Sequence, residues 1–211
     1  MLSFFKDDCN EIQMGIDEVG RGAFMGPVVA SGVIWDNEWL VKNMCKYESQ
    51  LNTIKDSKRL SEKRREQSAS FIKEHAKVYA IESVDANEID KKNILCATME
   101  AMYKCIDNVA SITRIDRLLI DGNYFKPYNN IPYNCVTDGD NHFLNIASAS
   151  ILAKVYRDNY IKEICKQNPE YQQKYQWENN KGYGTKKHIE GIKTWGLSPF
   201  HRKSFGICKT F

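Results

Sequence analysis

Residues 13–22 read QMGIDEVGRG and residues 27–35 read PVVASGVIW. Both stretches are rich in β-branched and other apolar residues, and they predict strands over residues 13–17 and 27–35. The glycines of residues 20–22 predict a tight turn between the strands, and such a short connection favours hairpin pairing. The first strand therefore ends on two acids, Asp17 and Glu18.

The rest of the chain alternates between strand and helix patterns. Residues 77–84, 117–121 and 133–136 predict strands, and residues 36–52 have a mixed pattern that suits a short helix. Ser61 predicts the start of a helix that runs to about His75, because its hydroxyl can cap the first turn. Residues 85–90 lead into a long helix, and further helices are expected over residues 144–164 and 186–194. The pattern predicts an α/β fold, a mixed sheet with helices on its faces, whose strand order does not follow from sequence.

Composition narrows the class of protein. The 211 residues carry a net charge of +3, and no apolar run approaches the roughly 20 residues of a membrane helix. The N-terminus lacks the basic and apolar regions of a secretion signal. Seven cysteines without a CxxC pair argue against a disulfide framework or a zinc ribbon, and free thiols suit a cytoplasmic location. The segment 181–209 is locally basic, and it predicts either a phosphate-facing surface or a solvated one.

Acids at the ends of predicted strands are the strongest chemical signal. Asp17 and Glu18 end the first strand, Asp121 ends RLLID (residues 117–121), and Asp140 lies in the DGD turn before a long helix. Several carboxylates at one sheet edge indicate a shared site for Mg²⁺ or Mn²⁺. For any single one of them taken alone, a local turn-stabilising role is the favoured explanation, because Asp is common where strands give way to turns. Because neighbouring strand residues point to opposite faces, Asp17 and Glu18 can share a site only if the chain turns at Glu18.

A second cluster, Asp56-Ser57-Lys58-Arg59, precedes the predicted helix start at Ser61, where backbone N–H groups favour anions. No Walker A motif occurs, and the four histidines lack the spacing of a metal site.

Taken together, these motifs resemble ribonuclease HII, a type 2 RNase H. The similarity runs in family order from about residue 13 to residue 206. The matching elements are residues 15–22 with 26–29, the DSK element at 56–58, the acidic strand 119–122, the helix signature 146–154 with Arg157-Asp158, and the C-terminal GYGT (182–185), His188, Gly196 and His201-Arg202.

The resemblance implies an RNase H-like mixed sheet and a single catalytic domain over residues 1–211, of which about 165–211 form a helical extension that contacts substrate. It implies two divalent cations, Mn²⁺ or Mg²⁺, held by Asp17, Glu18, Asp121 and Asp140. The substrates would be RNA–DNA hybrids and duplex DNA with single embedded ribonucleotides, cut on the 5′ side to leave a 5′-phosphate and a 3′-hydroxyl, as in ribonucleotide excision repair and DNA replication. Substrate contacts would come from the following residues: Gly20, Arg21, Gly22, Lys58, Lys154 and Tyr183.

One position departs from the family pattern. Asp138 stands where the family has a basic residue before Gly-Asp, and its charge is expected to raise the metal requirement. Three alternatives stay open. The first is a more general RNase H-like nuclease or a ribonuclease HIII, against which Arg21 and the short N-terminus argue. The others are a catalytically impaired hybrid-binding module and an α/β protein whose acids are all structural. We expect a monomer without membrane contact. The aromatic Phe211 at the end of the sequence belongs to no clear sliding-clamp motif.

Overall fold

Five strands form one mixed sheet in the computed structural model, which describes residues 2–4, 6, 10–55 and 60–211. The strand order is β3-β2-β1-β4-β5. β1 pairs antiparallel with β2, and β2 with β3, whereas β4 runs parallel to β1 and β5 parallel to β4. The predicted hairpin and the mixed α/β sheet are therefore confirmed. The strands span Gln13–Val19 (β1), Val28–Ile34 (β2), Val78–Val84 (β3), Arg117–Asp121 (β4) and Tyr133–Val136 (β5).

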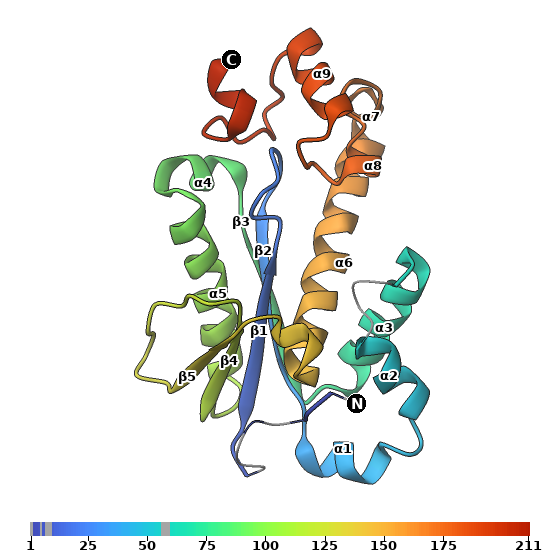
Figure 1. Ribbon diagram of the computed structural model, residues 1–211, viewed down its shortest axis with the longest axis vertical. Helices are drawn as coiled ribbons and strands as arrows, with labels where there is room; N and C mark the ends of the chain where they lie inside the picture. The colour runs from blue at the N-terminus through green and yellow to red at the C-terminus, as the bar shows by residue number, and fades with distance from the viewer. Residues whose placement is uncertain (1, 5, 7–9, 56–59) are drawn as a thin grey trace.

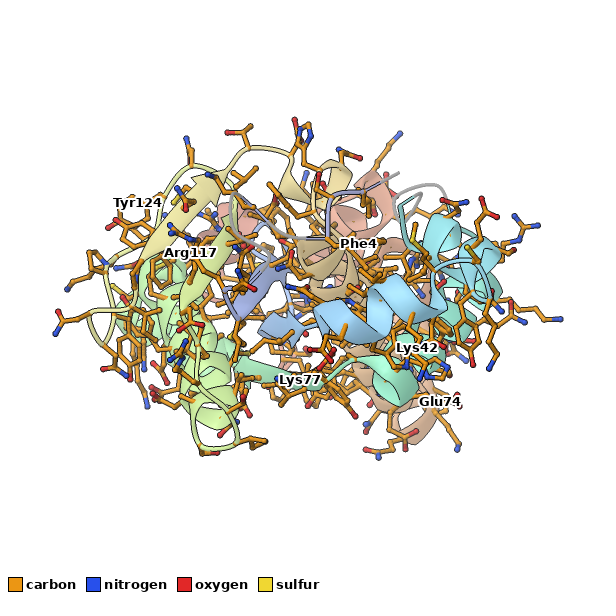
Figure 2. All side chains as sticks on the ribbon, turned by 90° about the horizontal axis from the view of Figure 1, so that it is seen from below. Phe4, Lys42, Glu74, Lys77, Arg117 and Tyr124 are labelled. Carbon is orange, nitrogen blue, oxygen red and sulfur yellow. The ribbon has the colours of Figure 1, made fainter. Side chains whose placement is uncertain are left out.

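Helices cover both faces of the sheet (Figure 1). On one face, α5 packs on β2 and β3 after the short helix α4. On the other, α6 lies along β1 and β2, and α2 and α3 pack against its outer side. Figure 2, seen from below, shows Arg117 and Tyr124 on the β4 side of the molecule and Lys42 and Glu74 on the opposite side. The bounds are Asn37–Asn43 (α1), Glu48–Lys55 (α2), Glu62–His75 (α3), Ala86–Lys92 (α4), Ile94–Ala110 (α5), Gly139–Asn141 (η2) and Leu144–Gln167 (α6).

Small residues at the start of α6 let it approach the sheet closely. This part of the helix carries Ala147, Ser148 and Ala149, all fully buried. A Cβ added to Gly15 of β1 would lie 2.4 Å from the backbone of Asn145. The close contact fixes the height of α6 over β1, and with it the position of the residues that follow along the helix.

Capping residues set the helix boundaries. The Ser61 hydroxyl accepts a hydrogen bond from the Arg64 N–H, which confirms the predicted start of α3. The residues that lead into the long helix α5 form a separate short helix, α4. Asn93 separates the two helices. Asn93 adopts φ 70°, and its side chain accepts from the Cys96 N–H to cap α5.

The C-terminal part packs above the sheet, at the end of α6 (Figure 1). Its apolar centre is Trp177, fully buried with Ile161 and Ile192, and Met25 from the β1–β2 connection inserts into the same cluster. This part consists of Pro169–Tyr175 (α7), Trp177–Asn180 (α8), Lys186–Trp195 (α9) and Gly206–Thr210 (η3).

The cysteines of the described ranges are free. Cys105, Cys165 and Cys208 are buried among apolar residues as expected, while Cys45 and Cys96 are exposed. In the same ranges, no helix combines the length and apolar character that a bilayer crossing requires.

Candidate active site

Three of the four predicted carboxylates lie on the two central parallel strands. Asp17 and Glu18 belong to the last part of β1, and Asp121 is the last residue of β4. Because β1 and β4 are parallel neighbours, their carboxyl ends meet at the same edge of the sheet. The fourth, Asp140, lies in η2, immediately before α6, and is buried.

Asp17 is a buried acid among other acids. Its carboxylate accepts a hydrogen bond from the Glu18 N–H at 2.7 Å and another from the Ser150 hydroxyl of α6. Burial raises the pKa of Asp17 well above its ordinary value, and the negative charges of Asp121 and Glu18 raise it further. The metal-free protein therefore holds Asp17 at an energetic cost, which a nearby cation would remove.

Glu18 faces the opposite side of β1. Together with Asp121 it lines a small pocket of about 100 Å³, whose floor is formed by apolar side chains of α5, among them Leu95 and Met99. Burial raises the pKa of Glu18, while the Arg21 guanidinium, 3.1 Å from its carboxylate, lowers it. The chain does not turn at Glu18, because β1 continues through Val19, which pairs with Val29 of β2.

Asp121 interacts with the acids on both faces of β1. Its charge raises the pKa of both Asp17 and Glu18, so all three carboxylates lie within electrostatic reach of one another. Its Oδ1 atom accepts the Gly139 N–H at 2.7 Å, which ties the residue next to Asp140 to the end of β4. A side chain at position 139 would meet Asp121 Oδ1 at 3.2 Å, so glycine permits this approach.

The donor set fits a hard divalent cation, since it consists of carboxylate oxygens whose mutual repulsion raises the pKa of Asp17. Within the described ranges, however, no group of three or more His, Cys, Asp or Glu side chains already has the geometry of a metal site. Asp17 and Glu18 lie on opposite faces of β1.

Two buried arginines hold the loop that follows β1. Arg157 of α6 donates to the carbonyl oxygens of Pro27, Met25 and Lys181 at 2.8–3.0 Å. Arg202 donates to the carbonyl oxygens of Gly26 and Arg21 at 2.9 and 3.0 Å. Burial lowers the pKa of both guanidiniums, that of Arg202 to about 9.

The support that Arg157 and Arg202 give to the loop after β1 was not predicted from sequence, although both arginines stand in motifs that resemble the family's. One nitrogen of Arg202, Nη2, is buried without a hydrogen-bond partner among the described residues. Gly20 lies directly against Arg157 with φ +89°, which explains the glycine at this position. The loop 20–22 therefore rests on a rigid floor next to Glu18.

The predicted substrate contacts divide into three groups. Tyr183 lies beside the loop, because Ala23 and Tyr183 form a β-bridge and the Arg157 guanidinium lies 5.5 Å from the tyrosine ring centre. Lys154 of α6 pairs with Asp158 at 2.7 Å, and burial lowers its pKa. Lys58 lies outside the described residues, as does the rest of the DSK element.

Not all residues of the basic segment 181–209 lie on the surface. Arg202, His188 and His201 are buried, so the expectation that these three face phosphate or solvent is wrong. His75 is half-buried, since it packs against the rings of Trp39, Tyr47 and Phe71. His142 lies on the surface.

Comparisons with known proteins agree with this architecture. A family model described as Ribonuclease HII matches residues 14–208. A curated ribonuclease HII from Parabacteroides distasonis is 43% identical over 200 residues, which cover 95% of this chain and 92% of the relative. The crystal structure of ribonuclease H2 from Pyrococcus horikoshii OT3 superposes with a TM-score of 0.72 at 22% identity, over 94% of this chain and 95% of that one. The ribonuclease HII of Archaeoglobus fulgidus, solved as a complex with PCNA, gives a TM-score of 0.70 at 23% identity, over 92% and 95%. At these identities, the two solved structures show a common fold.

Proposed function

The chain belongs to the ribonuclease HII family and is a type 2 ribonuclease H, and from this membership we propose that it hydrolyses RNA within hybrids and at single ribonucleotides in DNA. The family uses divalent metal ions and acts on RNA–DNA hybrids. The finer proposal is cleavage on the 5′ side of the ribonucleotide, leaving a 5′-phosphate and a 3′-hydroxyl. One domain would carry this activity, with residues from about 165 onward contacting substrate.

The observation that carries this proposal is the mutual position of Asp17, Glu18 and Asp121. Each lies at the carboxyl end of a central strand, and their charges act on one another. We propose that these three and Asp140 hold two cations, Mg²⁺ or Mn²⁺, with Asp121, whose charge acts on both Asp17 and Glu18, joining the two faces of β1 into one site. When bound, such cations lower the pKa of an attacking water and neutralise charge on the leaving oxygen.

The protein's own groups would orient the substrate around the carboxylates. The Gly139 N–H donates to Oδ1 of Asp121 and so restrains that carboxylate. Ser150 and the Glu18 N–H hold Asp17 in the same way, so neither carboxylate rotates freely. Fixed donor groups reduce the reorganisation needed when a phosphodiester arrives.

Recognition of the ribose would fall to residues 20–22, which directly follow Glu18. Only the 2′-hydroxyl distinguishes RNA from DNA at a given position, and a glycine loop lets backbone groups approach it. Because the Arg21 carbonyl is turned inward to Arg202, the loop has a defined orientation. Tyr183, next to Gly22, would pack on the deoxyribose that follows the ribonucleotide and so favour a junction. Lys154 would add a phosphate contact beside its ion pair with Asp158.

The experiment compares two substrates on the same enzyme preparation, with Mg²⁺ or Mn²⁺ and with chelator. One is a DNA duplex with a single ribonucleotide, and the other is a long RNA–DNA hybrid. The parent protein is expected to cut both in a metal-dependent manner. Tyr183→Ala should lower cleavage of the single-ribonucleotide duplex more than cleavage of the hybrid.

The matched control is Tyr79→Ala, on β3 at the far edge of the sheet. Tyr79 is 38% exposed and Tyr183 is 36% exposed, so the two truncations remove similar surface rings. Tyr79→Ala should leave both activities at the parent level. If the parent protein cuts the hybrid but leaves the single-ribonucleotide duplex intact in either metal, the proposed specificity is wrong.

A further inference from the structure

A chain of buried polar groups runs through the C-terminal part and ends at Tyr183. His201 Nδ1 accepts the Ser198 N–H at 2.9 Å, and His201 Nε2 lies 3.0 Å from His188 Nε2. His188 Nε2 also accepts the Trp177 indole N–H at 3.0 Å. On its other side, His188 Nδ1 lies 2.9 Å from the carbonyl oxygen of Tyr183. His188, His201 and Trp177 are buried.

The partners fix the protonation of both rings. An indole N–H and a backbone N–H only donate, so His188 Nε2 and His201 Nδ1 both act as acceptors. His201 therefore carries its proton on Nε2 and donates it to His188. His188 carries its proton on Nδ1 and donates it to the Tyr183 carbonyl. Burial lowers the pKa of His188, and it lowers that of His201 to about 3, so both rings are neutral at neutral pH.

The anchored carbonyl belongs to the residue that borders the loop after β1. Phe24 N–H donates to the Gly182 carbonyl at 2.8 Å, and Ala23 and Met25 form β-bridges with Tyr183 and His201. The Tyr183 ring itself is partly exposed and contacts the surface of Arg157. Its direction is therefore set by the backbone of residues 182–185, and His188 restrains that backbone from below.

We propose that His188 is a positioning residue that sets the preference for an RNA–DNA junction by fixing the main chain of Tyr183 against the loop 20–22. This rests on the proposed function, in which Tyr183 packs beside the junction. His201 and Trp177 act through His188, because each supplies a hydrogen bond that holds its ring in one orientation. Through this chain of hydrogen bonds, the C-terminal core influences substrate preference without contacting the carboxylates.

Two substitutions of His188 separate positioning from general packing. His188→Asn keeps an amide N–H at the position of Nδ1, so it retains the donor to the Tyr183 carbonyl. His188→Gln places its amide at the position of Nε2 and removes that donor. The quantity measured is the ratio of kcat/KM on the single-ribonucleotide duplex to kcat/KM on the long hybrid, in which the fraction of active enzyme cancels.

His188→Gln is expected to lower this ratio about three- to tenfold, the range expected for one net hydrogen bond. His188→Asn should keep the ratio within about twofold of the parent on the same scale. In a Tyr183→Ala background, His188→Gln should produce no further change, because the ring it positions is absent. If His188→Gln fails to fold, His201→Asn serves instead, since it keeps the acceptor for Ser198 N–H and removes the donor to His188.

Three results would overturn the inference: an unchanged ratio in His188→Gln, an equal fall in His188→Asn, or additive effects in the double variant. The proposed function is tested separately, by the Tyr183→Ala variant in the same experiment. If Tyr183→Ala alone leaves the ratio at the parent value, the role of Tyr183 is wrong before His188 is considered.

Discussion

Replacing Gly20 with alanine should destabilise the protein strongly, although only one methyl group is added. Gly20 has φ +89°, where an L-residue costs about 1–2 kcal/mol. The new Cβ would lie 2.3 Å from Arg157 Nε. Arg157 cannot move aside, because it donates hydrogen bonds to three backbone carbonyls. Overpacking of this kind adds about 1–3 kcal/mol.

The middle of these ranges gives a loss of about 3.5 kcal/mol in the free energy of unfolding. For a chain of this length, that loss corresponds to a fall of about 7–14 °C in Tm. Urea denaturation and calorimetry of the metal-free protein would measure it. Gly22→Ala is the matched control in the same loop. Its Cβ would meet only Tyr183 Cε1, at 4.0 Å, and its φ is not positive, so a change below about 1 kcal/mol is expected. Equal stability of the two variants would refute the account of the loop.

Three further substitutions test the carboxylates. Asp121→Asn should keep the fold, because its Oδ1 can still accept the Gly139 N–H, while hydrolysis of hybrids falls on the order of 100-fold or more; near-parental rates would contradict the assignment. Asp17→Asn should abolish hydrolysis yet stabilise the metal-free protein at neutral pH. The pKa of Asp17 is raised in the folded state, so the metal-free parent loses stability as pH rises from the ordinary value of 3.8 through the raised value. Urea titrations in chelator should show a smaller loss over that window in Asp17→Asn, and identical pH profiles would contradict the cause given for the shift. Asp138 has φ 52°, which asparagine tolerates better than lysine, so Asp138→Asn should tighten binding of hybrid at low salt, with an effect that shrinks as salt screens the charge. Equal affinities across a salt titration would place Asp138 away from substrate.

The sheet and its acids could be predicted from sequence because their signals are local. Strands such as Arg117–Asp121 and Tyr133–Val136 have the bounds that their apolar pattern predicts. Acids at strand ends follow from the same pattern, and parallel pairing brings Asp17 and Asp121 to one edge. Whether the chain turns at Glu18 could not be predicted, because it depends on how far β1 continues its pairing with β2.

The buried arginines and histidines could not be assigned from sequence for a different reason. Lys, Arg and His in a basic segment are ordinarily solvated, and no local pattern marks the few that are not. Arg202 is buried only because the loop after β1 folds back and presents the carbonyls of Arg21 and Gly26 to it. His188 is buried against Trp177 and His201 by the same kind of tertiary contact. Asn93 is an intermediate case, since its capping chemistry gives a local signal for the break between α4 and α5.

The clamp that Arg202 forms on residues 21 and 26 has a consequence for biosynthesis. Its two hydrogen bonds span 181 and 176 residues, so this part of the support of the loop next to Glu18 forms only after residue 202 has been made. Pairing β1 with β2 needs only a short stretch of chain and can precede the clamp. A nascent chain that lacks residue 202 would therefore display the loop after β1 without the two hydrogen bonds of Arg202, although Arg157 would already be present to hold Met25 and Pro27.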